Sequence, residues 1–188
     1  MIPLGYMLKK VVPPPKWMNA PNVDLVYSVS GHVSENFANY IPFWKHNGWW
    51  FFDDPSILQK VATENDIGLS DLTIFYYEAF ESEYDDEKKT WSPISPEASF
   101  TTDVKIPASK VLRGYDVVTF SAHTSAECSL LSCNSVAGTI PTNRFCLFDE
   151  FSQARDALEG DAFDNSEPGP SRIIAVYTTD LILDETKP

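Results

Sequence analysis

Three segments with the residue pattern of β-strands constrain the fold of this chain more than any other feature. In residues 71–80, apolar side chains recur at every second position, which is typical of a strand with one buried face. Residues 115–121 (YDVVTFS) and 172–178 (RIIAVYT) are rich in the β-branched and aromatic residues that favour strands. No regular alternation of strand and helix patterns connects them. The sequence therefore predicts an α+β fold, with a mixed, mainly antiparallel sheet packed against two or three short helices.

Two of the expected helices have clear start or stop signals. Asp54 followed by Pro55 supplies a carboxylate cap and a proline at the first helical position, ahead of an apolar stripe. Residues 149–159 present one apolar face and end at Gly160, a common helix terminator. A third helix is expected from Ser34, where apolar residues recur at helical spacing until Pro42 kinks or ends it.

Other segments give weaker expectations for the sheet. Residues 24–30 and 49–52 (WWFF) predict two further strands, the second of them central, and residues 90–100 predict an edge strand because they contain two prolines. The prolines at 13–15 and 21 predict that residues 1–22 are an extended arm on the surface, with 23–188 as a single domain. No internal repeat is evident. Seven residues are expected in the core: Leu25, Trp50, Val61, Ile74, Val118, Leu158 and Val176.

Charge restricts the partners of the protein. Lys and Arg number 14 against 27 Asp and Glu, a net charge of −13. This charge repels phosphate backbones and anionic membrane surfaces, so we expect no binding to nucleic acid or membrane. The acids concentrate in two places, residues 78–87 and the carboxyl-terminal part from residue 147. A basic protein is the partner that such a charge distribution favours.

The predicted docking face is the first acidic segment. Its six carboxylates belong to Glu78, Glu81, Glu83, Asp85, Asp86 and Glu87. The leading hypothesis is a non-enzymatic binding domain of inhibitory type. In charge and size alone, the chain is similar to small acidic immunity proteins that neutralise basic nuclease toxins.

The compartment follows from three observations. No apolar run reaches the length of about 18 residues that crosses a bilayer. The first ten residues lack the basic-then-apolar order of a secretory signal. Three cysteines are an odd and small number, which fits a reducing compartment. We therefore expect a soluble, cytoplasmic protein.

One stretch carries the residue types of a catalytic or metal site. His123, Cys128, Cys133 and Cys146 could in principle hold zinc, but their spacing lacks the tight pairs of structural zinc sites. We therefore expect no metal and no cofactor, and cysteines that pack as small apolar side chains.

A thiol enzyme is the alternative, with Cys133 as nucleophile and His32, His46 or His123 as its base. The sequence contains no glycine-rich phosphate loop and no serine hydrolase motif. Cys133 lies between Ser132 and Asn134, away from acids in the sequence, so it is the thiol expected to react first.

Overall fold

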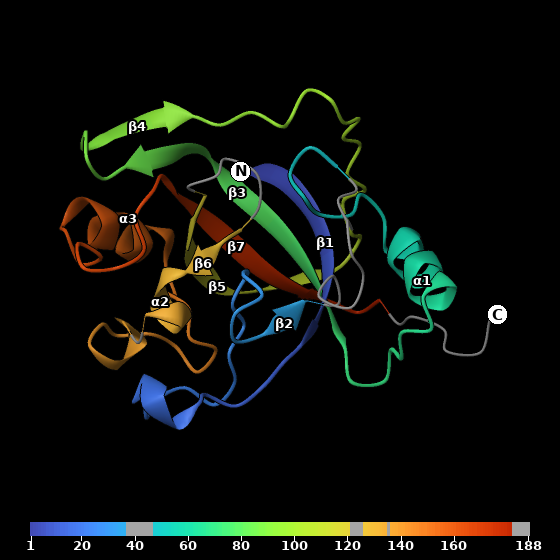
Figure 1. Cartoon of the computed structure of the whole chain (residues 1–188), viewed down its shortest axis with the longest axis horizontal. Helices are drawn as coiled ribbons and strands as arrows, with labels where there is room; N and C mark the ends of the chain where they lie inside the picture. The colour runs from blue at the N-terminus through green and yellow to red at the C-terminus, as the bar shows by residue number, and fades with distance from the viewer. Residues whose placement is uncertain (37–46, 121–125, 135, 182–188) are drawn as a thin grey trace.

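The computed structural model describes residues 1–36, 47–120, 126–134 and 136–181. Seven strands form one sheet that curls into a half-barrel, in the order β2-β1-β3-β7-β5-β6, with β4 paired to β3 (Figure 1). Every pairing among the described strands is antiparallel. The predicted α+β fold with a mainly antiparallel sheet is confirmed.

The strands are β1 (Ile2–Lys10), β2 (Glu35–Asn36), β3 (Thr73–Asp85), β4 (Thr90–Pro93), β5 (Lys110–Thr119), β6 (Cys128–Ser129) and β7 (Ser171–Thr179). The helices are α1 (Pro55–Glu64), α2 (Leu130–Cys133) and α3 (Phe151–Glu159), with short 3₁₀ turns at Lys16–Met18 and Val136–Gly138. No helix among the described residues is long and apolar enough to cross a membrane.

The elements with strong local signals are confirmed. Helix α1 begins at Pro55, where the Asp54 carboxylate accepts a hydrogen bond from the Ser56 amide at 2.8 Å. Helix α3 ends at Gly160 and begins with a reciprocal pair of side-chain caps between Glu150 and Gln153. The three strongest strand patterns correspond to β3, β5 and β7, and β4 is the predicted edge strand.

The expected amino-terminal arm is wrong for residues 2–10, which form β1 inside the sheet. This strand pairs with β3 along most of its length, and its residues 4–9 are all buried. Side chains on both of its faces are covered, so it lacks the simple alternation of a half-buried strand. The prolines that suggested an arm begin only at Pro13, beyond the end of the strand.

Three further expectations are corrected. Residues 24–30 form no strand; Val26 makes a single bridge to Val12. Residues 49–52 form a turn with one bridge, from Phe52 to Tyr6, and are not a central strand. The helix expected from Ser34 is replaced at residues 35–36 by β2, and its remainder lies outside the described residues.

Two clusters of buried apolar side chains form the core, one including α1 and the other including α3. Four of the seven predicted core residues are buried: Ile74, Val118, Leu158 and Val176. The other three, Leu25, Trp50 and Val61, are only partly buried. Val26 and Val29 take the place of Leu25, because segment 24–30 does not alternate as a strand does.

An internal repeat that the sequence does not reveal organises the sheet. Strands β1 and β3 with α1 between them in the chain correspond to β5 and β7 with α3. One row of paired residues crosses the four central strands: Gly5 pairs with Tyr77, Tyr77 with Val176, and Val176 with Gly114. A glycine stands at each end of the row, in β1 and in β5, so the two halves are related by a pseudo-twofold axis that passes between β3 and β7.

Each half contains the same asparagine-centred turn before its helix. In the first half, Asn47 Oδ1 accepts from the amides of Trp49 and Phe51 at 2.9 and 3.0 Å. Its Nδ2 donates to the Leu4 carbonyl at 2.9 Å and to Asp53 Oδ1 at 2.8 Å. The side chain thus satisfies the amides that a strand partner would have bonded, which explains why residues 49–52 turn.

The second half repeats this network around Asn143. Its Oδ1 accepts from the amides of Phe145 and Leu147 at 2.9 and 3.2 Å. Its Nδ2 donates to the Arg113 carbonyl at 2.8 Å and to Asp149 Oδ1 at 3.1 Å. Both turns therefore connect the first strand of their half to the start of its helix.

We expect Asn47→Ala and Asn143→Ala each to lower the free energy of unfolding by about 2 to 4 kcal/mol, because each removes four hydrogen bonds around a turn. Urea unfolding measures the loss, with Asn65→Ala as the control. Asn65 is exposed and donates one side-chain hydrogen bond to the Val61 carbonyl. Losses as small as that of the control would contradict the role of the two turns.

Candidate functional site

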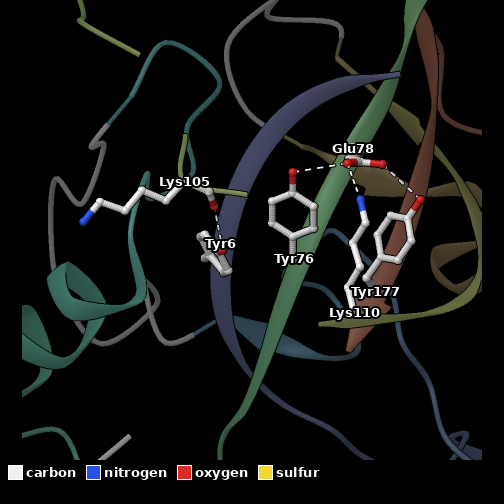
Figure 2. Close-up of polar contacts among 6 residues, drawn as sticks. All are labelled: Tyr6, Tyr76, Glu78, Lys105, Lys110 and Tyr177. Carbon is white, nitrogen blue, oxygen red and sulfur yellow. Dashed lines mark hydrogen bonds and ion pairs between the residues drawn. The ribbon is translucent and has the colours of Figure 1, made fainter. Parts of the chain in front are cut away.

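The six predicted docking carboxylates do not share one environment. Glu78 lies on the face of the sheet shown in Figure 2, where Lys110 Nζ donates to its carboxylate at 2.5 Å. The hydroxyls of Tyr76 and Tyr177 donate to the same carboxylate at 3.2 and 3.0 Å. Burial disfavours the charged carboxylate, but these donors outweigh it and lower the pKa of Glu78. Glu78 is thus satisfied within the fold.

Glu83 is also engaged inside the fold. Its carboxylate accepts from Arg172 Nε at 2.9 Å, and the two side chains are only 15% and 7% exposed. The Arg172 guanidinium lies over the Phe120 ring, 4.0 Å from its centroid. Of the other four acids, Asp85 pairs with Lys88, while Glu81, Asp86 and Glu87 are exposed.

The two acidic segments of the sequence converge beside α3. The exposed residues Asp161, Asp164 and Glu167, which follow α3, surround a small hollow together with Asp86 from the β3–β4 turn. We call these four residues the acidic patch. Figure 1 shows α3 and the β3–β4 hairpin on the same side of the molecule, opposite α1. Of the residues described, Lys89 is the one basic residue that lines the hollow, and it pairs with Asp161 and Asp164.

The hollow has an apolar part, supplied by Leu130, Leu158 and Phe163. Its volume is only about 20 Å³. This volume holds about one water molecule, so the hollow is too small for a small-molecule ligand.

The structure brings two of the four predicted metal or thiol residues into contact. Cys128 and Cys133 share a hydrogen bond between their thiol groups. Cys146 is buried, and His123 lies outside the described residues, as does His46. No three Cys, His, Asp or Glu side chains among the described residues are placed to hold a metal ion.

Cys133 has the environment of a stabilised thiolate. The Cys128 thiol donates to its sulfur, the Ser30 hydroxyl lies 3.5 Å from it, and His32 is near. Together these groups outweigh burial and lower the pKa of the Cys133 thiol to about 6. By contrast, burial raises the pKa of Cys146 to about 12.

A buried polar network that the sequence analysis missed lies next to this thiol pair. Lys9 is fully buried, and its ammonium donates to the carbonyls of Ser28, Val29 and Ser30, at 3.0 Å for Val29 and 2.6 Å for Ser30. The Val29 amide donates to Asp116 Oδ2 at 2.9 Å. Residues 28–30 are therefore held between a lysine of β1 and an aspartate of β5.

Both charged groups of this network have shifted pKa values. Burial lowers the pKa of Lys9 to about 7, although the charge of Asp116 opposes the shift. Burial likewise raises the pKa of Asp116 to about 7, against stabilisation by Ser129 and the Val29 amide. The Oδ1 atom of Asp116 has no hydrogen-bond partner within the described part of the chain.

One sequence signal could have located this network. Asp is depleted within strands, so Asp116 inside the clear strand pattern 115–121 indicates a buried acid that needs a partner. Lys9 gives no comparable signal, because the prolines that follow it predict an extended surface arm, in which a lysine is solvated.

Two larger hollows lie away from these groups. One, of about 380 Å³, is lined by Lys10 and by residues between 65 and 72. The other, of about 270 Å³, is lined by residues 20–23 and 137–142. Among the residues that the structure describes, no cysteine or histidine lines either of these two hollows.

Comparison with known proteins found no matching family model, no similar curated protein and no similar solved structure.

Proposed function

We propose that this protein is a non-enzymatic binding domain whose acidic patch docks a basic protein partner. The observation that carries the proposal is the convergence of Asp86 with Asp161, Asp164 and Glu167 around one hollow. Four exposed carboxylates surround a hollow next to the partly exposed Phe163, and within the described part of the chain Lys89 is the one basic residue that lines it. Such a surface complements a lysine or arginine whose charged end meets carboxylates and whose stem contacts apolar side chains.

The docking face is narrower than the six carboxylates of residues 78–87. Glu78 and Glu83 are held by Lys110 and Arg172. A partner would have to break these half-buried ion pairs to reach them, which costs more than an exposed contact returns. Asp86 is the member of the first acidic segment that belongs to the face, and the remaining members come from the chain after α3.

The net charge of −13 supports a protein partner over a nucleic acid, since it repels phosphates and accelerates encounter with a positively charged surface. The three free cysteines fit a reducing compartment, and we propose the cytoplasm as its location.

Neutralising the patch tests the proposal. We expect the variant Asp86→Asn, Asp161→Asn, Asp164→Asn and Glu167→Gln to associate about tenfold more slowly with the basic partner at about 50 mM salt. Asn tolerates the left-handed backbone of Asp161, at φ 61°, so the fold should persist. Basic proteins retained from lysate by the wild type are purified, and their association rates are then measured against each variant.

The control removes the same charge elsewhere, through Glu64→Gln, Asp66→Asn, Asp71→Asn and Asp103→Asn, all at exposed positions. We expect this variant to associate within about twofold of the wild type, because short-range steering depends on where the charges lie. Equal slowing by both variants would mean that net charge alone attracts the partner. An unchanged rate for the patch variant would place docking elsewhere.

A further inference from the structure

Cys128 and Cys133 lie at the two ends of a short segment that consists of β6 and α2. The Cys133 side chain is partly exposed, whereas Cys128 is 4% exposed. Their thiols are in hydrogen-bond contact, and Asn134 Nδ2 lies 3.6 Å from the Cys128 sulfur. The segment therefore presents one accessible sulfur with a second sulfur directly behind it.

We propose that Cys128 and Cys133 form a redox-active dithiol, which closes to an intramolecular disulfide by exchange with a low-molecular-weight disulfide. Cys133 is the attacking residue and Cys128 is the resolving residue. Nothing in the proposed docking function requires this chemistry, and the pair lies outside the acidic patch.

The exchange proceeds in two balanced steps. In the first, the Cys133 thiolate attacks one sulfur of the small disulfide; a Cys133–sulfur bond forms, the disulfide bond breaks, and one thiolate leaves and takes up a proton. In the second, Cys128 loses its proton and attacks the Cys133 sulfur, which expels the second small thiol. Two protein thiols are oxidised and one small disulfide is reduced to two thiols.

The contacts around the pair fit both roles. Hydrogen bonds from Cys128 and Ser30 and the nearby His32 favour the Cys133 thiolate, and partial exposure admits the reagent. The Cys128 pKa is raised first by its hydrogen bond to Cys133 and then by burial. Capping Cys133 removes that negative charge, so Cys128 ionises more easily at the moment it must attack.

The test is peptide mapping under non-reducing conditions, after the folded protein reacts with oxidised glutathione at about pH 7. We expect the wild type to lose two hydrogens, to carry a Cys128–Cys133 disulfide and to retain no glutathione. The Cys128→Ala variant should instead retain one glutathione on Cys133, because the resolving thiol is absent. The Cys146→Ala variant should behave as the wild type, and dithiothreitol should restore the thiols.

Three results would overturn the proposal. They are a stable glutathione adduct on Cys133 of the wild type, modification of Cys146 before Cys133, and failure of the folded wild type to react. The wild-type measurement decides the matter even if Cys128→Ala does not fold. Alkylation rates give a second readout, with Cys133 expected to react about tenfold or more faster than Cys146 at neutral pH.

Discussion

Replacing Gly114 or Gly5 with alanine is expected to lower the free energy of unfolding by about 3 to 5 kcal/mol in each case. Gly5 has φ +123° and Gly114 has φ +141°, which side-chain-bearing residues rarely adopt. A Cβ at Gly5 would lie 2.5 Å from the Phe52 carbonyl oxygen, and one at Gly114 would lie 2.5 Å from the Phe148 carbonyl oxygen. Neither carbonyl can move easily, because Phe52 is held by its β-bridge to Tyr6 and Phe148 by its β-bridge to Tyr115.

Gly68→Ala is the matched control, because no atom lies within 4 Å of a Cβ at that position. We expect it to change the free energy of unfolding by less than about 1 kcal/mol. Urea unfolding of the three variants gives the comparison. The pairing register shifts next to both glycines, between Pro3 and Gly5 in β1 and between Leu112 and Gly114 in β5. If Gly5→Ala and Gly114→Ala differ widely, or if both match Gly68→Ala, the two halves do not share this strand geometry.

The sequence does contain this repeat, but at too few positions to be recognised. Gly5-Tyr6 corresponds to Gly114-Tyr115, Asn47 to Asn143, and Phe52-Asp53 to Phe148-Asp149. The residues between glycine and asparagine differ in number in the two halves, and the apolar residues of the turns differ in kind. What the halves share is backbone geometry, including a positive φ at Trp50 (66°) and at the equivalent Cys146 (63°).

Local signals predicted the helices because a cap acts within one turn of the chain. Asp54, Pro55 and Gly160 lie next to the residues they start or stop. Local signals did not predict strand β1, because its place in the sheet depends on pairing with β3, which is more than 60 residues away in the chain. Burial on both faces also removed the alternation that identifies a strand.

The candidate sites also combine features that the sequence predicted with contacts that depend on the fold. The sequence located the acidic segments, but only the fold shows that Asp86 lies with the carboxylates after α3 while Glu83 is held by Arg172. It also singled out Cys133, from its neighbours in the chain. The proximity of Ser30 and His32 to Cys133 depends on the segment before β2 lying against β6 and α2, which are about 100 residues away in the chain.

Lys9→Met is the second substitution with a large expected effect, a loss of about 3 to 5 kcal/mol in the free energy of unfolding. It leaves the carbonyls of residues 28–30 without their buried donor and leaves Asp116 without its cation. Lys10→Met is the control: Lys10 is the next residue of β1 and is exposed. We expect the control to change the free energy of unfolding by about 0.5 kcal/mol or less.

The loss should be larger at about pH 9 than at about pH 6. In the wild type, the pKa of Lys9 is lowered to about 7 in the folded state. Between that pH and about 10 the unfolded chain therefore binds more protons at this lysine than the folded chain does, so the free energy of unfolding rises with pH. In Lys9→Met this gain disappears. In the variant, the pKa of Asp116 rises further because the cation is gone, so ionisation of this buried acid continues to lower the free energy of unfolding above pH 7. Both changes increase the difference between the proteins with pH, and urea unfolding at the two pH values measures it; equal losses at both would mean that Lys9 is not buried against Asp116.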